Sequence, residues 1–315
     1  MLRIFFLLIS VFFTIAFSAQ TESKITLRTA KGTVIYGTIQ MPDNKDTMPL
    51  AIIIPDFKTA DKNQSDLIDI SIKTLSDSLC SKGIACLRYD KRGTGKSIVS
   101  GDELFNLSFD TQIDDVLEWV NRFANNAKFT EIILIGYGEG ALVGMLAAEK
   151  NNLIQKFVSL AGAGMSAACV LQEQIDCKFE SFPQKKQISY ELINNWQNGK
   201  KNDIIPTYLH TVFPPNMQQY MISWFTYNPQ TEITKLKIPI LLIHGTTDAQ
   251  VSVSNATLLA QANSNAKTVL IENMNHQLRQ CSSTHQLSQY AANCKQNMPV
   301  KSEVCTAIAN FIFQR

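Results

Sequence analysis

Residues 132–142 read IILIGYGEGAL, an apolar run that leads through three alternating glycines into a second apolar segment. A short apolar run bounded by glycine is typical of a strand that is buried on both faces. The residues that follow, 141–148, have apolar side chains at helical spacing and predict a helix. Because glycine tolerates tight backbone paths, the glycines predict a sharp turn between the strand and the helix.

Similar apolar runs recur on both sides of this segment, and helical patterns separate most of them. The expected strands are 50–54, 84–87, 132–135, 157–160, 238–243 and 269–271. The expected helices include 67–79, 113–123, 141–148 and 304–313. Residues 24–40 alternate polar and apolar side chains around a glycine and predict an antiparallel hairpin. Buried strands that alternate with helices indicate an α/β fold with a parallel sheet covered on both faces.

The glycine-rich turn suits two kinds of site. A dinucleotide site would use Gly136, Gly138 and Ala141 and would need an acidic residue about 20 positions later. That acid is missing, and two strand–helix units precede the turn, so this interpretation is disfavoured. The second kind is the nucleophile elbow, G-x-S-x-G, which lifts a serine hydroxyl above the sheet edge. Gly136 and Gly140 occupy its flanking positions, but Gly138 stands where the serine belongs.

An acid and a histidine follow the last two expected strands. Asp248 comes shortly after strand 238–243, and His276 comes shortly after strand 269–271. An elbow, then an acid, then a histidine is the chain order of an α/β-hydrolase triad. We therefore predict that Asp248 and His276 form the remaining catalytic dyad. His244 lies at the end of its strand and is interpreted as a packing residue.

At these residues the chain resembles the α/β-hydrolase superfamily, in particular its serine esterase and serine-aminopeptidase-like branch. Residues 88–97, RYDKRGTGKS, are similar to the loop after that family's fourth strand. A phosphate-binding Walker A loop is disfavoured because Asp90 stands where its first glycine is required. The resemblance implies an α/β-hydrolase fold, with a mostly parallel central sheet, helices on both faces and a helical lid insertion. The aromatic side chains of the insertion either line a ligand pocket or pack it against the sheet.

The loop after the third expected strand departs from this resemblance. It reads PDFKTAD over residues 55–61, where relatives of this branch carry small, glycine-rich residues. The resemblance assigns oxyanion or substrate-binding roles to Phe57 in this loop and to Glu139 after the elbow. Asp56 would add a negative charge where another must form, unless Lys58 neutralises it. Loss of the serine itself costs on the order of a millionfold in turnover.

Three explanations fit these departures. An engineered replacement of serine by glycine would leave the altered oxyanion loop unexplained. An active carboxylic-ester hydrolase would use Asp248 to orient His276, which would activate a water directly. A non-catalytic pocket would bind a small acyl ester, a peptide-like ligand or a partner, and we favour this third interpretation of a catalytically impaired or inactive relative. No cofactor is expected, and without C-x-x-C spacing no zinc or other metal site is expected.

Residues 1–19 predict export. Arg3 supplies a positive charge, an apolar run covers 4–17, and the small residues Ser18 and Ala19 follow, a pattern typical of a secretory signal peptide. The run is shorter than the about 20 residues of a spanning helix, and an uncleaved N-terminal anchor is the alternative. A secreted or periplasmic protein with no stable membrane span after cleavage is expected. The expected organisation is a signal peptide (1–19), an N-terminal core part (20–165), a helical lid (166–235) and a C-terminal core part (236–315).

Composition indicates a globular chain that acts on small molecules. Charged residues make up 18% of the 315 residues, and the net charge is only +2, so no nucleic-acid partner is expected. The chain has seven cysteines, and export would permit disulfides. Cys281 and Cys294 bracket a polar stretch and are either bridged or two free thiols. Cys86 lies in an apolar run and is interpreted as a buried hydrophobe.

Overall fold

The computed structural model describes residues 20–43, 45–57, 62–285, 288, 289, 291 and 299–314. The predicted signal peptide, Lys58 and Cys294 lie outside these residues. Within them, the cysteines at positions 80, 86, 169, 281 and 305 are free thiols. No helix of the described part combines the length and the apolar character needed to cross a bilayer.

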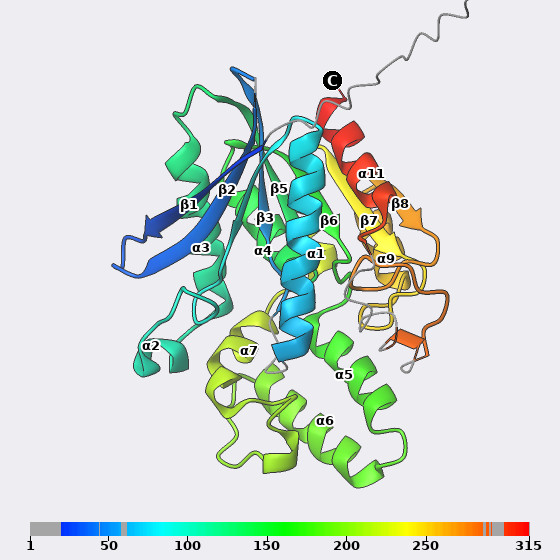
Figure 1. Cartoon of the computed structure of the whole chain (residues 1–315). Coiled ribbons are helices and arrows are strands. Elements are labelled where there is room, and N and C mark those ends of the chain that lie inside the picture. The colour runs from blue at the N-terminus through cyan, green and yellow to red at the C-terminus, as the bar shows by residue number, and fades with distance from the viewer. Residues whose placement is uncertain are drawn as a thin grey trace, which may run out of the picture.

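An eight-stranded sheet forms the centre of the molecule (Figure 1). The strands are β1 (Gln20–Arg28), β2 (Val34–Pro42), β3 (Met48–Ile54), β4 (Ala85–Tyr89), β5 (Phe129–Tyr137), β6 (Ile154–Leu160), β7 (Ile240–Gly245) and β8 (Ala266–Ile271). Their order across the sheet is β1-β2-β4-β3-β5-β6-β7-β8. The pairs from β4 through β3 to β8 are parallel, while β1 and β2 form an antiparallel edge. The predicted mostly parallel sheet is confirmed.

Each expected apolar run lies largely within a strand, but the strand limits differ. β5 begins three residues earlier than its apolar run, at Phe129, because its first residues lie near the surface, where apolar side chains are not required. β7 begins at Ile240 rather than at residue 238, because Pro239 has no N–H to donate to a neighbouring strand. The N-terminal hairpin is longer than predicted and pairs Gln20 with Pro42.

Helices cover both faces of the sheet. They are α1 (Lys62–Ser81), α2 (Gly101–Phe105), α3 (Phe109–Phe123), α4 (Glu139–Lys150), α5 (Ala167–Lys178), α6 (Pro183–Gln197), α7 (Gln218–Trp224), α8 (Pro229–Lys235), α9 (Ser254–Ala262) and α11 (Ser302–Phe313), with 3-10 turns η1 (Thr207–Leu209) and η2 (Pro215–Met217). α1 and α11 lie in front of the sheet in Figure 1, and α3 and α4 lie behind it. Successive residues of β3 separate the two layers: Ile53 faces the α1 and α11 core, whereas Ile52 and Ile54 face the α3 and α4 core.

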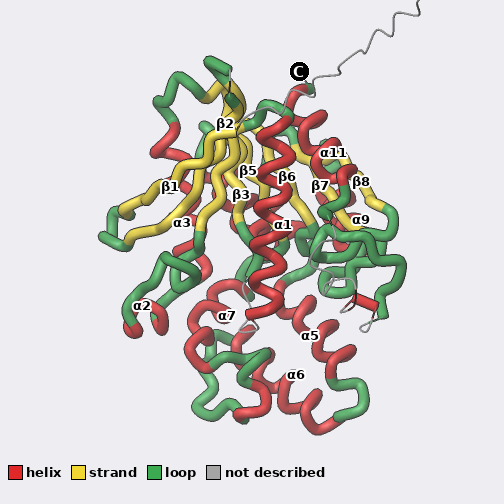
Figure 2. Tube along the Cα trace, viewed as in Figure 1, coloured by secondary structure: helices red, strands yellow, loops and turns green. Residues whose placement is uncertain are grey.

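The segment between β6 and β7 is helical. Its helices α5, α6 and α7 lie beyond the carboxyl ends of the parallel strands (Figure 2), whereas α8 packs against α4 and α9. Trp196 of α6 is buried and contacts Phe213, with ring centroids 5.3 Å apart. These two aromatics therefore pack within the insertion itself.

Candidate active site

The turn at Gly138 is as sharp as its sequence predicts. β5 ends at Tyr137 and α4 begins at Glu139, so Gly138 alone makes the connection, with φ 56° and ψ −118°. This left-handed backbone strains any residue with a Cβ atom. A Cβ atom at Gly140 would lie 2.4 Å from the carbonyl oxygen of Ile54, so the start of α4 packs directly against the end of β3.

The structure brings Asp248 and His276 together. His276 donates a hydrogen bond from Nδ1 to Oδ2 of Asp248 over 2.7 Å, although the residues are 28 positions apart. The other carboxylate oxygen, Oδ1, accepts the backbone N–H groups of Gln250 and Val251, each at 2.9 Å. Tyr137 donates its hydroxyl to the carbonyl of His276 at 2.5 Å and stacks on the imidazole. The loops after β7 and β8 are thus held against the elbow.

Asp56 occupies the remaining side of the imidazole. Its Oδ2 accepts a hydrogen bond from Nε2 of His276 at 3.0 Å, and its Oδ1 accepts the backbone N–H groups of Phe57 and Glu139, both at 2.7 Å. The two backbone donors expected at an oxyanion site therefore converge, but on a carboxylate of the protein itself. Sequence reasoning placed a negative charge in this region and missed the contact with His276. The signal in the sequence for this contact was that positions 56 and 138 both differ from the family pattern in the same chain.

The Asp56 carboxylate also fills the space above the elbow. A Cβ atom built on Gly138 would lie 2.1 Å from Oδ1 and 2.2 Å from Cγ of Asp56. Such distances are far below van der Waals contact, so a serine at position 138 requires Asp56 to move. The carboxylate thus takes both the volume and the imidazole hydrogen bond that a serine side chain would have.

Gly138→Ala should destabilise the protein by about 1–3 kcal/mol, because the new methyl group collides with Asp56 and the backbone is left-handed. Urea unfolding measures this loss. The same substitution in an Asp56→Gly background is the matched control and should cost less, because only the backbone strain remains. Equal losses in the two backgrounds would mean that the carboxylate does not fill this space.

Asp56, His276 and Asp248 form a buried row of alternating charge. Burial favours the neutral imidazole, but the carboxylates of Asp248 and Asp56 outweigh it and raise the pKa of His276 to about 10. Burial alone would raise the pKa of Asp56, yet the hydrogen bond and charge of His276 hold that pKa below its usual value. At neutral pH the row is therefore carboxylate, imidazolium, carboxylate. Nε2 then carries a proton and faces Asp56, so His276 has no lone pair with which to activate a water.

The side chain of Glu139 points away from this row. Its carboxylate forms a buried ion pair with Lys91 at 2.8 Å and accepts the hydroxyl of Tyr220 from α7. Burial raises the pKa of Glu139, and the Lys91 ammonium lowers it in part. Lys91 belongs to the loop that resembles the family's loop after the fourth strand. These contacts tie that loop and α7 of the insertion to the first turn of α4.

Phe57 joins the site to the insertion through its ring. The ring centroid lies 5.9 Å from that of Trp224 and 6.2 Å from that of Tyr220, both on α7. Phe109 of α3 stacks on Trp224 at 5.6 Å. The backbone N–H of Phe57 thus serves the Asp56 carboxylate, while its side chain belongs to an aromatic cluster under the insertion.

His244 packs beside the site. It is buried and contacts the carbonyl of Val251 through Nε2 at 2.8 Å, which helps to hold the loop that carries Asp248. Burial lowers the pKa of His244, and the nearby Asp248 opposes the shift only in part. A neutral His244 in this position is consistent with packing.

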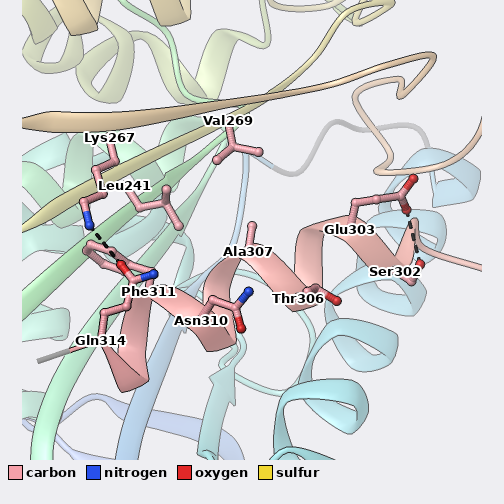
Figure 3. A pocket seen from close by; sticks show the side chains of 10 residues that line it. All are labelled: Leu241, Lys267, Val269, Ser302, Glu303, Thr306, Ala307, Asn310, Phe311 and Gln314. Carbon is pink, nitrogen blue, oxygen red and sulfur yellow. Dashed lines mark hydrogen bonds between the residues drawn. The ribbon is translucent and has the colours of Figure 1, made fainter.

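Two cavities of the described part lie away from the dyad. The larger, of about 440 Å³, lies between the strands β7 and β8 and helix α11, where Leu241 and Val269 face Ala307 and Phe311 (Figure 3). The second, of about 280 Å³, adjoins the ends of β3 and β4 and includes Pro55. Neither is lined by Gly138, Asp248 or His276. Within the described residues, no cluster of three or more His, Cys, Asp or Glu side chains is arranged to hold a metal ion.

Comparisons with known proteins identify the family of the chain. Residues 71–280 match the family described as Serine aminopeptidase, S33. Esterase EstD of Thermotoga maritima is 23% identical over 244 residues, which cover 76% of this chain. The chain spans 57% of the length of that curated relative.

Solved esterases share the fold. Est1E from Butyrivibrio proteoclasticus superposes with a TM-score of 0.58 at 17% identity, over 92% of this chain and 99% of that one. The Pyrococcus furiosus esterase Pf2001 superposes with a TM-score of 0.62 at 16% identity, over 93% and 90%. The implied α/β-hydrolase fold is confirmed. Since the family model covers well over half of the chain, the protein belongs to the serine aminopeptidase S33 family, in the esterase-like branch of the α/β-hydrolases.

Proposed function

We propose that this protein is an exported member of its family that has lost serine-dependent hydrolysis of carboxylic esters and peptides. In this proposal it keeps Asp248 and His276 as the remnant of the triad and binds a small acyl ester or a peptide-like ligand. Est1E has been solved with ferulic acid bound, at a TM-score of 0.58 and 19% identity over 90% of this chain and 99% of that one. That complex supports an aromatic or acyl small molecule as the class of ligand. Export rests on the leader-like pattern of residues 1–19.

One observation carries the loss of activity: the Asp56 carboxylate holds both backbone donors and the Nε2 atom of His276. Ester hydrolysis needs those donors free for the oxygen on which charge develops. It also needs a nucleophile, and Gly138 supplies none. The paired changes at positions 56 and 138 argue against an engineered replacement of one residue, because a single change leaves Asp56 unexplained.

The same observation disfavours direct activation of water by His276. A general base must hold a lone pair within hydrogen-bond reach of the water. Here Nε2 donates to Asp56, and two carboxylates stabilise its proton. Removing that proton at neutral pH would leave the carboxylates of Asp56 and Asp248 without the positive charge that stabilises both.

The proposal predicts that the wild-type protein turns over p-nitrophenyl acetate and butyrate no faster than His276→Gln. Stopped assays at high protein concentration, with thermal unfolding of both proteins as the folding control, measure the difference. Slow turnover that His276→Gln abolishes would overturn the proposed loss of activity and support the water mechanism. Turnover that is equal in the two proteins, at the level of buffer alone, is the expected result.

A further inference from the structure

One face of the antiparallel edge of the sheet carries two cations in a row. The strand register pairs Lys24 of β1 with Thr38 of β2, and Thr38 with Arg88 of β4. Arg88 in turn pairs with Ile53, which faces the α1 and α11 core. Side chains that pair directly in a sheet lie on the same face, and neighbouring strands are about 4.8 Å apart. The cations of β1 and β4 therefore lie on the α1 face, with one neutral residue between them.

This row borders the cavity of about 280 Å³, which Lys24 and Arg88 both line. Lys96, in the loop after β4, lines the cavity as a third cation. Among the described residues, the ammonium groups of Lys24 and Lys96 form no ion pair or hydrogen bond. The charge of both lysines is thus available to a molecule in the cavity.

Arg88 also keeps an unused donor. Its Nη2 donates to the carboxylate of Glu22 at 2.9 Å, whereas its buried Nε has no partner among the described residues. A buried donor of a charged group that is left without an acceptor lowers stability. A second acceptor at the guanidinium would remove this cost.

The acids near the cavity balance these cations only in part. Of the charged residues that line the cavity, three are cations and two, Asp69 and Asp90, are acids. Asp90 accepts the backbone N–H of Lys96 through Oδ2 at 2.8 Å, and Asp69 also interacts with another group. The side chain of Glu22 keeps 42% exposure, so water screens its charge. The cavity therefore favours an anion.

The remaining wall indicates what kind of anion fits. Ile53 of β3, Ile72 of α1 and Pro55 after β3 give the cavity an apolar side. Small-molecule sites typically combine such a surface with a few polar groups that fix the orientation of the ligand. The planar guanidinium of Arg88 matches a carboxylate. A bare inorganic anion would leave the apolar side uncovered.

We propose that this cavity binds a small carboxylate with a short apolar body, such as an aromatic or short-chain acid. Arg88 binds the carboxylate, Lys24 and Lys96 add their charge, and the apolar body packs on Ile53 and Ile72. This site goes beyond the proposed function and does not depend on it. It is separate from Asp248 and His276, neither of which lines the cavity.

Binding of benzoate and hexanoate by the wild-type protein, measured by isothermal titration calorimetry, tests the class of ligand. Benzamide and hexanamide are the matched uncharged probes and should bind at least about 10-fold more weakly, because they cannot form the charged pair with Arg88. Inorganic phosphate should bind more weakly than either acid, because it has no apolar body. If phosphate binds more tightly than both acids, or the amides bind as well as the acids, the assigned ligand class is wrong.

Two variants that break the same ion pair test the position of the site. Arg88→Gln should weaken benzoate binding about 10- to 100-fold, which is the usual contribution of a hydrogen bond to a charged group. Glu22→Gln also breaks the pair but leaves the guanidinium to the ligand, so binding should be unchanged or tighter. Equal weakening in both variants would mean that the pair acts only on the structure and would overturn the proposal.

A second pair of variants keeps the test valid if Arg88→Gln does not fold. Lys24→Gln breaks no ion pair and should weaken benzoate binding by at least about 3-fold, because one cation of the cavity is lost. Lys31→Gln is the matched control, since Lys31 lies in the turn of the same hairpin and does not line the cavity. Its affinity for benzoate should equal that of the wild type. Equal affinities of the two variants would overturn the proposal.

His276→Gln separates this site from the dyad. The variant should bind benzoate as tightly as the wild type, whatever the outcome of the ester hydrolysis assays. A loss of benzoate binding in folded His276→Gln would place the acid at the dyad and overturn the proposed site. Absence of saturable binding of both acids to the wild type up to about 10 mM would overturn it as well.

Discussion

The double variant Gly138→Ser with Asp56→Gly should acquire serine hydrolase activity that neither parent substitution produces. Serine at position 138 supplies the nucleophile, and glycine at position 56 vacates the space 2.1 Å from the new Cβ atom. It also frees the backbone donors of Phe57 and Glu139 and the Nε2 atom of His276. With the Asp56 charge gone, the pKa of His276 falls and the imidazole can accept the serine proton.

The measurement is labelling by a fluorophosphonate probe together with turnover of p-nitrophenyl butyrate. The double variant should exceed Gly138→Ser alone by at least about 1,000-fold, because the single variant keeps its oxyanion donors blocked and its histidine protonated. The same double variant with His276→Gln is the control and should stay unlabelled. If Gly138→Ser alone reacts as fast as the double variant, Asp56 does not obstruct the elbow. A folded double variant that stays unlabelled would mean that Asp248 and His276 are not the remnant of a triad.

The stability of the protein should fall as the pH rises from 6.5 to 10. A histidine whose pKa rises on folding stabilises the protein fully below the unfolded pKa of about 6.5, and this contribution disappears as the pH passes the folded value of about 10. The buried charges of Asp56 and Asp248 cause this rise. The contribution of His276 to the free energy of unfolding that is lost over this range is on the order of 5 kcal/mol, since each pKa unit is worth about 1.4 kcal/mol.

Asp56 is expected to have the opposite effect in acid, where the stability of the protein should fall as the pH decreases. Its pKa is lowered on folding, so its contribution is present above the unfolded pKa of about 4 and is lost as the pH falls through the folded value. Urea unfolding between pH 4 and 10 tests both limbs. His276→Gln is the control for the alkaline limb and should remove most of the difference between pH 6.5 and pH 10. If the free energy of unfolding of His276→Gln falls between pH 6.5 and pH 10 as much as that of the wild type, the imidazole is not the group that titrates.

These expectations share one physical basis. In a site that excludes water, a carboxylate next to an imidazole is stabilised by it and in turn keeps it protonated. Asp56 therefore blocks serine chemistry in three ways, because it fills the space of the serine, takes the oxyanion donors and removes the general base. The same contacts place its Oδ1 where charge is stabilised.

Much of the architecture was open to prediction from local pattern. Apolar runs identified the parallel strands, most of which are buried on both faces, although β8 exposes Leu270. The glycines around Gly138 identified the sharp turn before α4. The first and last residues of the strands were less predictable, because β5 and the hairpin extend into polar residues that lie near the surface. Helix α2 was not foreseen, because it buries none of its five residues and so has no apolar pattern.

The sequence by itself determined the sheet, the elbow without its nucleophile and the order in which an acid and a histidine follow the last strands. Parallel strands bring their carboxyl ends to one edge, so this order was enough to expect that Asp248 and His276 meet. Only the tertiary structure decided that Asp56 binds His276, because that hydrogen bond joins residues 220 positions apart and depends on the exact path of the loop after β3. Neither residue carries a local pattern that reveals the contact. Its energy arises from burial and from the close approach of opposite charges, and both exist only once the chain has folded.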